Sequence, residues 1–254
     1  MDIFSIILYS VLPSILYTSL LYVIIPHHTF KIKTALTYWV GGVISVLLII
    51  GFYKVFPEWI NLASSTYNPY SDRLNYLHTM FFIQVGLLEE SFKLVMFLIL
   101  ILIGYKVKWL KNISPVAVMF YMGMIGLGFS AMENISYGME AYNAANTLKI
   151  RSITAVPAHL VFGLYMGYFI AKGVSILKIT HRSLIDYLLL KRTCLRIIIY
   201  TLFGLFVSTI LHGIYNLHIA LNQMASISGT YTFLFIATFG LYWCYKDLVK
   251  INSN

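Results

Sequence analysis

Long apolar runs, separated by short polar segments, fill most of the chain. A helix needs about 20 residues to cross a hydrocarbon core of about 30 Å. Runs of that length lie near residues 3–25, 35–56, 79–104, 113–137, 156–178, 196–220 and 226–246. They predict an all-α fold, a single polytopic transmembrane bundle of about seven membrane-spanning helices that occupies residues 1–254. The Trp- and Pro-bearing stretch 57–78 leaves room for an eighth, interfacial helix.

The composition points to a membrane protein. Of the 254 residues, 59% are hydrophobic and only 11% are charged, whereas a soluble domain carries about a quarter charged residues. A cytosolic enzyme, a nucleic-acid-binding module and a disordered tail all fit this composition poorly, and the lipid bilayer is the expected environment. The net charge of +9 then reports membrane topology, so we expect no nucleic-acid partner.

Basic residues are concentrated on one side of the predicted bundle. The loops and helix ends of that side hold Lys31, Lys33, Lys106, Lys108, Lys111, Lys172, Lys178, Arg182, Lys191, Arg192, Arg196, Lys246 and Lys250. The opposite side holds only Lys54, Arg73, Lys149 and Arg151. Because cytoplasmic loops are enriched in Lys and Arg, we expect the N-terminus outside and the C-terminus in the cytoplasm. That arrangement requires an odd number of crossings.

Three acidic residues lie within or at the end of apolar runs, namely Glu89, Glu90 and Glu133. An ionised carboxylate inside a bilayer costs several kcal/mol unless something compensates its charge. Lys93 follows Glu89 by four positions and Glu90 by three, so an ion pair on one helical face is the simplest compensation. A single ammonium offsets only one carboxylate. The second glutamate therefore needs a proton, a metal ion or another partner.

Three further polar residues, His159, His212 and Asn216, also lie in apolar runs. Each belongs to a stripe of small residues at helical spacing, and the glutamate at 133 lies on a similar stripe. The stripes are Gly123, Gly126, Ser130, Glu133 and Tyr137; His159, Gly163, Gly167 and Ala171; and Thr201, Gly204, Ser208, His212 and Asn216. Small residues let helix backbones approach closely, so these faces should point into the bundle. The predicted topology places the polar groups in the outer half of the membrane. A structural hydrogen-bonding role remains the alternative for each histidine.

Four segments in this order resemble the PrsW family of bacterial intramembrane proteases, relatives of the CAAX prenyl endopeptidases and bacteriocin-processing proteins. They are LEESFK at 88–93, GLGFSAMENISY at 126–137, His159, and HGIYN at 212–216. One departure is Ala155, which stands four residues before His159 where the related motif has Phe. The resemblance implies a multi-pass protein of the bacterial cell membrane with its catalytic core at about 79–220. It also implies site-one cleavage of a single-pass membrane protein such as an anti-sigma factor.

The chemistry of peptide hydrolysis suggests a role for each group. A carboxylate in a low-dielectric cavity is a stronger base than an exposed one, so Glu89 with His159 would activate the attacking water. His212 and Asn216 would donate hydrogen bonds to the oxyanion. The roles left for the other groups are supporting ones: Glu90 would orient the site or pair with Lys93, and Glu133 with Asn134 would support the catalytic groups.

Other interpretations stay open at this point. Glu89, His159 and His212 are suitable ligands for a catalytic zinc ion, although the HExxH motif is absent, so both a metal-free and a zinc-dependent mechanism are compatible with the sequence. Intramembrane carboxylates also occur in cation- or proton-coupled transporters, but no inverted repeat or through-membrane polar route is visible. A non-catalytic immunity or scaffold protein on the same fold is a third interpretation.

Overall fold

The computed structural model describes residues 1–25, 31–106, 114–175, 186–222 and 227–253, and every regular element in these ranges is helical. The α-helices are α1 (Ile3–Ile24), α2 (Ile32–Val55), α3 (Leu62–Thr66), α4 (Arg73–His78), α5 (Leu88–Lys106), α6 (Pro115–Glu140), α7 (Ala144–Ile153), α8 (Ala155–Ser175), α9 (Asp186–Asn222) and α10 (Ile227–Ser253). A 3-10 helix η1 (Pro57–Asn61) and a π-helical segment η2 (Thr79–Leu87) complete the order. The all-α prediction is confirmed for the described part of the chain.

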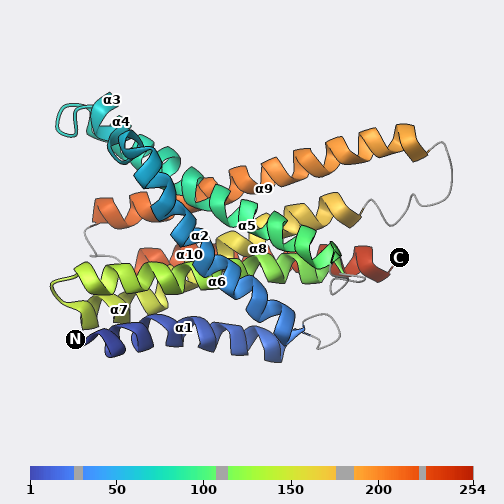
Figure 1. The fold of residues 1–254 in the computed structure, drawn as a ribbon, viewed down its shortest axis with the longest axis horizontal. Helices are drawn as coiled ribbons and strands as arrows, with labels where there is room; N and C mark the ends of the chain where they lie inside the picture. Colours follow the sequence, from blue (N-terminus) through green and yellow to red (C-terminus); the bar gives the residue numbers. More distant parts are fainter. Residues whose placement is uncertain (26–30, 107–113, 176–185, 223–226, 254) are drawn as a thin grey trace.

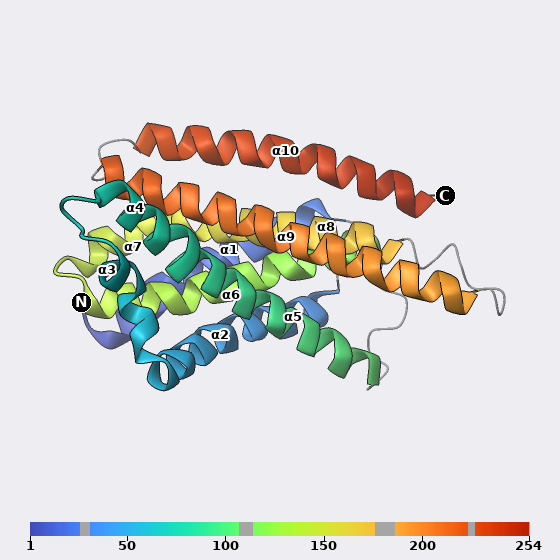
Figure 2. The ribbon, with the colours of Figure 1, turned by 90° about the horizontal axis from the view of Figure 1, so that it is seen from above.

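Within the described ranges, five helical stretches are long and apolar enough to cross a membrane. They are α1, α2, α6, the stretch Ala144–Ser175 that contains α7 and α8, and Cys194–Leu221 within α9. The predicted runs at 79–104 and 226–246 also form helices, but they do not belong to this group. The helices α1, α6, α8, α9 and α10 run roughly along one axis, α2 and α5 cross them obliquely, and the two termini lie at opposite ends of the bundle (Figures 1 and 2).

Two segments differ in detail from the sequence expectation. The stretch 57–78 forms η1, α3 and α4, three short helices in place of one interfacial helix. The second difference is α7, which the hydrophobic pattern did not predict. Its ten residues have too little apolar character to stand out between two long runs, and the side chain of Asn143 caps the helix by accepting from the Asn146 amide at 3.1 Å. Short polar helices of this kind depend on capping and tertiary contacts.

The π-helical segment η2 stands immediately before the first site residue. Gln84 ties it to the preceding segment: its Nε2 donates to the Ile60 carbonyl at 2.6 Å, and its Oε1 accepts from the Ala63 amide at 3.0 Å. The Gln84 carbonyl also accepts a hydrogen bond from the indole of Trp59 at 3.0 Å. Single π-helical turns are frequent near functional sites. Here these three hydrogen bonds fix the start of α5, where Glu89 lies.

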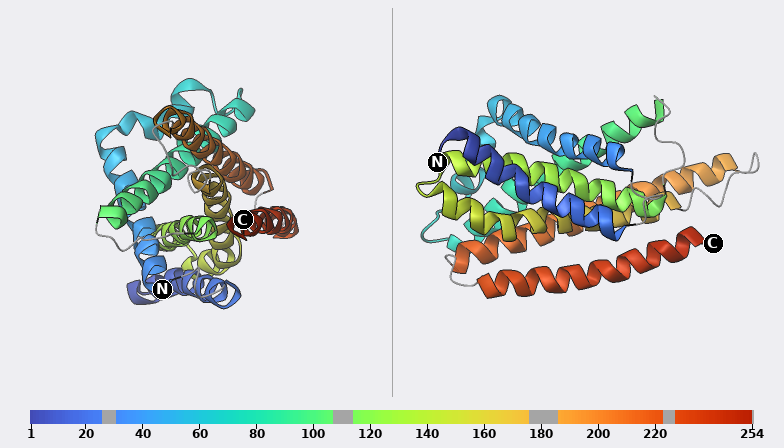
Figure 3. Two further views of the ribbon diagram at one scale, coloured as in Figure 1. Left: turned by 90° about the vertical axis from the view of Figure 1, so that its right-hand side faces the viewer. Right: turned by 90° about the horizontal axis from the view of Figure 1, so that it is seen from below.

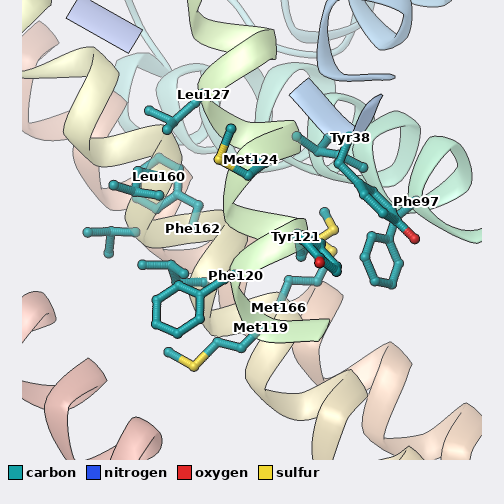
Figure 4. Packing of buried hydrophobic residues seen from close by; sticks show 14 of the residues in the cluster. Tyr38, Phe97, Met119, Phe120, Tyr121, Met124, Leu127, Leu160, Phe162 and Met166 are labelled. Atoms are coloured by element: carbon teal, nitrogen blue, oxygen red, sulfur yellow. The ribbon is translucent and has the colours of Figure 1, made fainter. Parts of the chain in front are cut away.

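The apolar core surrounds α6. Nearly every residue of α6 between Pro115 and Ala131 is buried, and the helix packs against α1, α2, α8 and α10. Viewed along the bundle axis, α6 lies inside the ring of other helices (Figure 3). In Figure 4 the large side chains of α6 interdigitate with those of α8 and with Tyr38 and Phe97. The helix that carries Glu133 and Asn134 is therefore the central helix of the described bundle.

Small residues let α6 approach its neighbours closely. A Cβ atom on Gly126 would overlap the carbonyl oxygen of His159, and one on Gly128 would overlap the carbonyl of Trp39 in α2. Gly163 of α8 meets the Met122 backbone in the same way. The small-residue stripes thus lie on packed faces as predicted, except that Tyr137, at the end of its stripe, is exposed.

The contact at Gly126 provides a test of this packing. We expect Gly126→Ala to destabilise the folded protein by about 1–3 kcal/mol, because the added methyl group must displace backbone of α8. Gly51→Ala in α2 is the matched control, since a Cβ there has open space around it, and it should be neutral or slightly stabilising. Reversible unfolding in detergent, followed by circular dichroism, measures both. Equal stability of the two variants would contradict the packing argument.

Candidate active site

Seven ionisable side chains from five helices gather in one cluster. They are Glu89, Glu90 and Lys93 of α5, Glu133 of α6, Arg151 of α7, His159 of α8 and His212 of α9. The helix α7 lies at the end of the bundle that also holds the N-terminus (Figure 1). Residues separated by more than 120 positions in the sequence are thus in direct contact.

Glu90 and Lys93 form the innermost pair. Both residues are fully buried, and the Lys93 Nζ to Glu90 Oε1 distance is 2.7 Å. The same Glu90 oxygen lies 2.9 Å from Nδ1 of His212. Glu89 is more loosely associated, because its Oε2 is 3.8 Å from the Lys93 ammonium and its side chain keeps 14% of its surface exposed. The ammonium therefore compensates mainly the charge of Glu90. Glu89 is the carboxylate that can still bind another partner.

Hydrogen bonds extend the cluster from Lys93 to α7. The Lys93 ammonium lies 3.0 Å from Nδ1 of His159, and Nε2 of His159 lies 2.9 Å from Oε2 of Glu133. That same carboxylate oxygen accepts a 2.7 Å bond from Nη2 of Arg151. This series of side-chain hydrogen bonds joins α5, α8, α6 and α7.

The donors in this series determine which histidine nitrogens carry hydrogen. An ammonium has no acceptor, so Nδ1 of His159 must accept from Lys93, and its Nε2–H then donates to Glu133. His212 has the opposite arrangement: its Nδ1–H donates to the Glu90 carboxylate, so in the neutral ring Nε2 is the nitrogen with the lone pair. That nitrogen lies 3.8 Å from Glu89 Oε2. The two histidines are therefore chemically distinct.

A cavity of about 590 Å³ opens beside the cluster. Among the residues proposed from sequence, Glu89, Glu133, His159 and Asn216 line it. Its apolar wall is formed by Met80, Phe81 and Val85 of η2 and by Ile219 and Ala220 of α9. Glu90, Lys93 and His212 lie behind the lining residues. The cavity thus offers a water-sized or peptide-sized group direct access to Glu89 but not to Glu90.

Sequence reasoning missed Arg151, which it treated as a loop charge. Its guanidinium bonds to Glu133 and, through Nε, to Oδ1 of Asn134 at 2.7 Å. If α7 is treated as a helix, the spacing of polar residues in the sequence indicates that Arg151 faces the cavity. Thr147, Arg151 and Thr154 recur at spacings of four and three, and all three line the cavity. Asn134 itself is fully buried, and its Nδ2 has no hydrogen-bond partner.

The cluster has the donors that a metal ion requires. One ligand atom each from Glu89, His159 and His212 lies within 4.8 Å of the other two, and tetrahedral zinc holds its ligand atoms roughly 3.3 Å apart. Oε2 of Glu89 is buried and has no hydrogen-bond partner in the described part of the chain, as expected of a carboxylate oxygen that can bind a cation. These residues therefore fit a metal site, provided that His159 releases one of its two hydrogen bonds.

Comparison with known proteins places this cluster in a family. The sequence profile described as PrsW family intramembrane metalloprotease matches residues 31–242. The chain belongs to the PrsW family. This match runs from α2 into α10 and contains all seven clustered residues. The PrsW assignment and the membrane-spanning helices together identify a multi-pass membrane protein of bacteria.

Two curated relatives agree with the family match. A protein named Protease PrsW from Clostridioides difficile is 30% identical over 135 residues, which cover 52% of this chain and 50% of the relative. Another Protease PrsW, from Oceanobacillus iheyensis, is 34% identical over 92 residues, 36% of this chain and 40% of the relative. The chain thus spans half or less of the length of these relatives. No solved structure matches it.

The buried Glu90–Lys93 pair predicts a large stability effect. Replacing Lys93 by Met leaves the Glu90 carboxylate buried without its ammonium, and breaking a buried pair in this way costs about 3–5 kcal/mol. The control is Lys172→Met, which breaks the 2.7 Å pair with Asp247 whose side chains are 27% and 39% exposed, at a cost of at most about 1 kcal/mol. Denaturant titrations in detergent give both free energies of unfolding. A smaller loss for Lys93→Met than for the control would refute the assignment of this pair.

Proposed function

We propose that this chain is an intramembrane endopeptidase that cuts a single-pass membrane protein at a site near the outer face of the membrane. The observation that carries the proposal is the Glu89 carboxylate, which lines the cavity and has a buried oxygen 3.8 Å from Nε2 of His212 with no hydrogen-bond partner among the described residues. Membership of a family described as intramembrane metalloproteases supports the reaction class. Site-one cleavage of an anti-sigma factor is the substrate proposal that follows from the PrsW resemblance.

The proposed topology has seven crossings, with the N-terminus outside and the C-terminus in the cytoplasm. Two observations support it: the termini lie at opposite ends of the bundle (Figure 1), and the helices predicted at 79–104 and 226–246 are present. Some of the basic residues behind the orientation, namely Lys108, Lys111, Lys178 and Arg182, lie outside the described residues. In this topology the cavity opens toward the exterior, where water and a substrate ectodomain are available.

Glu89 is the proposed base for the attacking water. Its carboxylate faces the cavity, and the ammonium of Lys93 is engaged mainly by Glu90. Glu89 therefore retains the capacity to accept a proton from water and to deliver it afterwards to the leaving amine. Glu90 has the complementary role of a fixed anion. It orients His212 through the 2.9 Å bond to Nδ1, so that Nε2 faces Glu89.

The remaining groups act on the substrate or on one another. Asn216 lines the cavity with an amide that donates but cannot titrate, which suits it to bind the oxyanion of the tetrahedral intermediate. His159 and Glu133 also line the cavity, and their 2.9 Å hydrogen bond holds the imidazole in place. The apolar wall formed by η2 would receive the side chains of an unwound substrate segment.

A metal-dependent mechanism is the alternative to base catalysis by Glu89, which would then be a metal ligand. Glu89, His159 and His212 would hold zinc, which supplies Lewis-acid polarisation of the scissile carbonyl and makes water a better nucleophile at neutral pH. His159 would give up its contact with Lys93 to provide Nδ1, and its Nε2–H would keep the hydrogen bond to Glu133. Glu90, behind the cavity, would continue to hold His212, in the manner of a carboxylate that orients a metal-bound histidine.

The alternative classes predict different arrangements. A cation- or proton-coupled transporter needs polar groups along a route through the membrane. In the described part of α6, the residues between Val116 and Leu127 on the inner side of the cluster form a tightly packed apolar core, which favours the protease. A non-catalytic immunity or scaffold protein is the remaining alternative, and loss-of-function substitutions distinguish it.

Glu89→Gln is expected to abolish cleavage, with a loss of about 10²–10⁴-fold, because the amide cannot accept a proton from water. The assay co-expresses the protein with epitope-tagged single-pass membrane proteins encoded next to it and follows release of their ectodomains. Glu58→Gln, an exposed change in the 3-10 helix η1 outside the cavity lining, is the matched control and should cleave normally. Undiminished release by a Glu89→Gln protein present at normal membrane levels would remove Glu89 from the mechanism.

Metal dependence has a separate expected outcome. Under the metal-dependent mechanism, protein purified in detergent and stripped with a chelator should lose cleavage activity, and stoichiometric Zn²⁺ should restore it, because the Glu89, His159 and His212 ligands remain in place. Metal content measured by mass spectrometry accompanies each activity. Full activity of a preparation that contains no metal would leave the metal-free glutamate mechanism as the correct one.

A further inference from the structure

Arg151 binds three side chains in one turn of α6 at the edge of the cavity. Its Nη2 and Nε donate 2.7 Å bonds to Glu133 Oε2 and Asn134 Oδ1, and its guanidinium carbon lies 3.7 Å from the ring centroid of Tyr137. The side chain is only 16% exposed. A planar guanidinium with donors in a fixed fork is suited to hold two oxygens at once in one geometry.

The oxygen that Arg151 holds is also the partner of His159. Oε2 of Glu133 accepts from both Nη2 of Arg151 and Nε2 of His159. The position of this single atom therefore determines where the imidazole N–H points. The other ring nitrogen is fixed by Lys93, so the ring is held from both ends.

The backbone between Arg151 and His159 is short and almost entirely helical, so the two side chains have little room to move relative to each other. Arg151 lies in the last turn of α7, and Thr154 alone separates α7 from α8. The Thr154 amide donates to the Arg151 carbonyl at 3.4 Å, and the Thr154 carbonyl accepts from the Ala158 amide at 3.1 Å. The guanidinium and the imidazole thus approach Glu133 from two helices whose junction is itself hydrogen-bonded.

We propose that Arg151 is a positioning residue of the active site: by holding Glu133 from α7, it fixes the orientation of the His159 ring, whose tautomer is set by the Lys93 ammonium. The catalytic meaning of this role rests on the proposed function, whereas the structural effect does not. The alternative is a purely electrostatic role, in which Arg151 only offsets the charge of Glu133. In that case its loss would lower stability but leave the His159 ring of the folded protein unchanged.

The decisive experiment needs neither substrate nor metal. The full-length protein, labelled with ¹⁵N in its histidine rings, is purified metal-free in detergent, and His159 is assigned by the signals that disappear in His159→Gln. The wild type should show His159 as the Nε2–H tautomer and His212 as the Nδ1–H tautomer. In Arg151→Gln, the His159 ring should keep the Nε2–H tautomer that Lys93 imposes, but its signals should shift or broaden, because Glu133 no longer holds the Nε2–H in one direction. Lys149→Gln, an exposed change on the same helix, should leave them unchanged.

A second measurement links the ring to zinc. Zn²⁺ alone is titrated into each metal-free variant, and Arg151→Gln should bind it about 10–100-fold more weakly, the usual effect of losing a residue that orients a ligand. Arg151→Lys keeps the charge but lacks the fork, so it should recover only part of the affinity and show a smaller His159 shift. If Arg151→Gln does not fold, the same two readouts on Arg151→Lys decide the question.

The outcomes separate the two proposals. Unchanged His159 signals in a folded Arg151 variant would overturn the positioning role, whatever the enzyme does. Shifted signals in a protein whose wild type neither binds Zn²⁺ nor cleaves would retain the positioning role and refute the proposed function. Lower thermal stability of Arg151→Gln with wild-type His159 signals would assign Arg151 a purely electrostatic role.

Discussion

The buried ammonium of Lys93 is the constraint on which the arrangement of the bundle depends. A charge in this environment requires close partners, and Lys93 finds them in Glu90 at 2.7 Å, His159 at 3.0 Å and the ring of Phe129 at 3.8 Å from its centroid. These partners come from α5, α8 and α6. Because Glu90 also binds His212 of α9, one compensated charge brings four helices together. The same contacts that remove the cost of burial therefore assemble the groups needed for hydrolysis.

Adjacent glutamates have different environments because consecutive helical residues point about 100° apart. Glu90 faces the interior and is fully buried, whereas Glu89 reaches the cavity with 14% of its side chain exposed. The two carboxylates are therefore electrostatically different, and they suit different roles in catalysis. One carboxylate is committed to Lys93 and His212 and provides fixed charge and orientation. The other has an oxygen that lacks a hydrogen-bond partner among the described residues and lies 3.8 Å from the Lys93 ammonium, so it is available to act on water or on a metal ion.

The sequence predicted the helices and the intramembrane polar residues because both signals are local: apolar length, and charge where charge is costly. It did not determine whether Lys93 pairs with Glu89 or Glu90, since spacings of four and three are both compatible with contact on a helix. Rotation of α5 against α8 and α9 decides that question, and it is a tertiary property. Arg151 was missed for a different reason. It lies on α7, a short polar helix whose existence depends on a capping side chain and on packing beside the cavity.

Backbone packing sets the distances within the cluster. Gly126 lets α6 approach so closely that a Cβ atom there would overlap the carbonyl oxygen of His159, and seven residues further along the helix Glu133 accepts the His159 N–H at 2.9 Å. Phe129 lies between these positions and supports the Lys93 ammonium. A single face of α6 thus fixes the height of α8, the position of the cation and the acceptor for the imidazole. Rigid helices joined by glycine contacts hold side-chain geometry more tightly than loops do. Gly126 and Phe129, which carry no polar side-chain group, therefore help to fix the geometry of the proposed site.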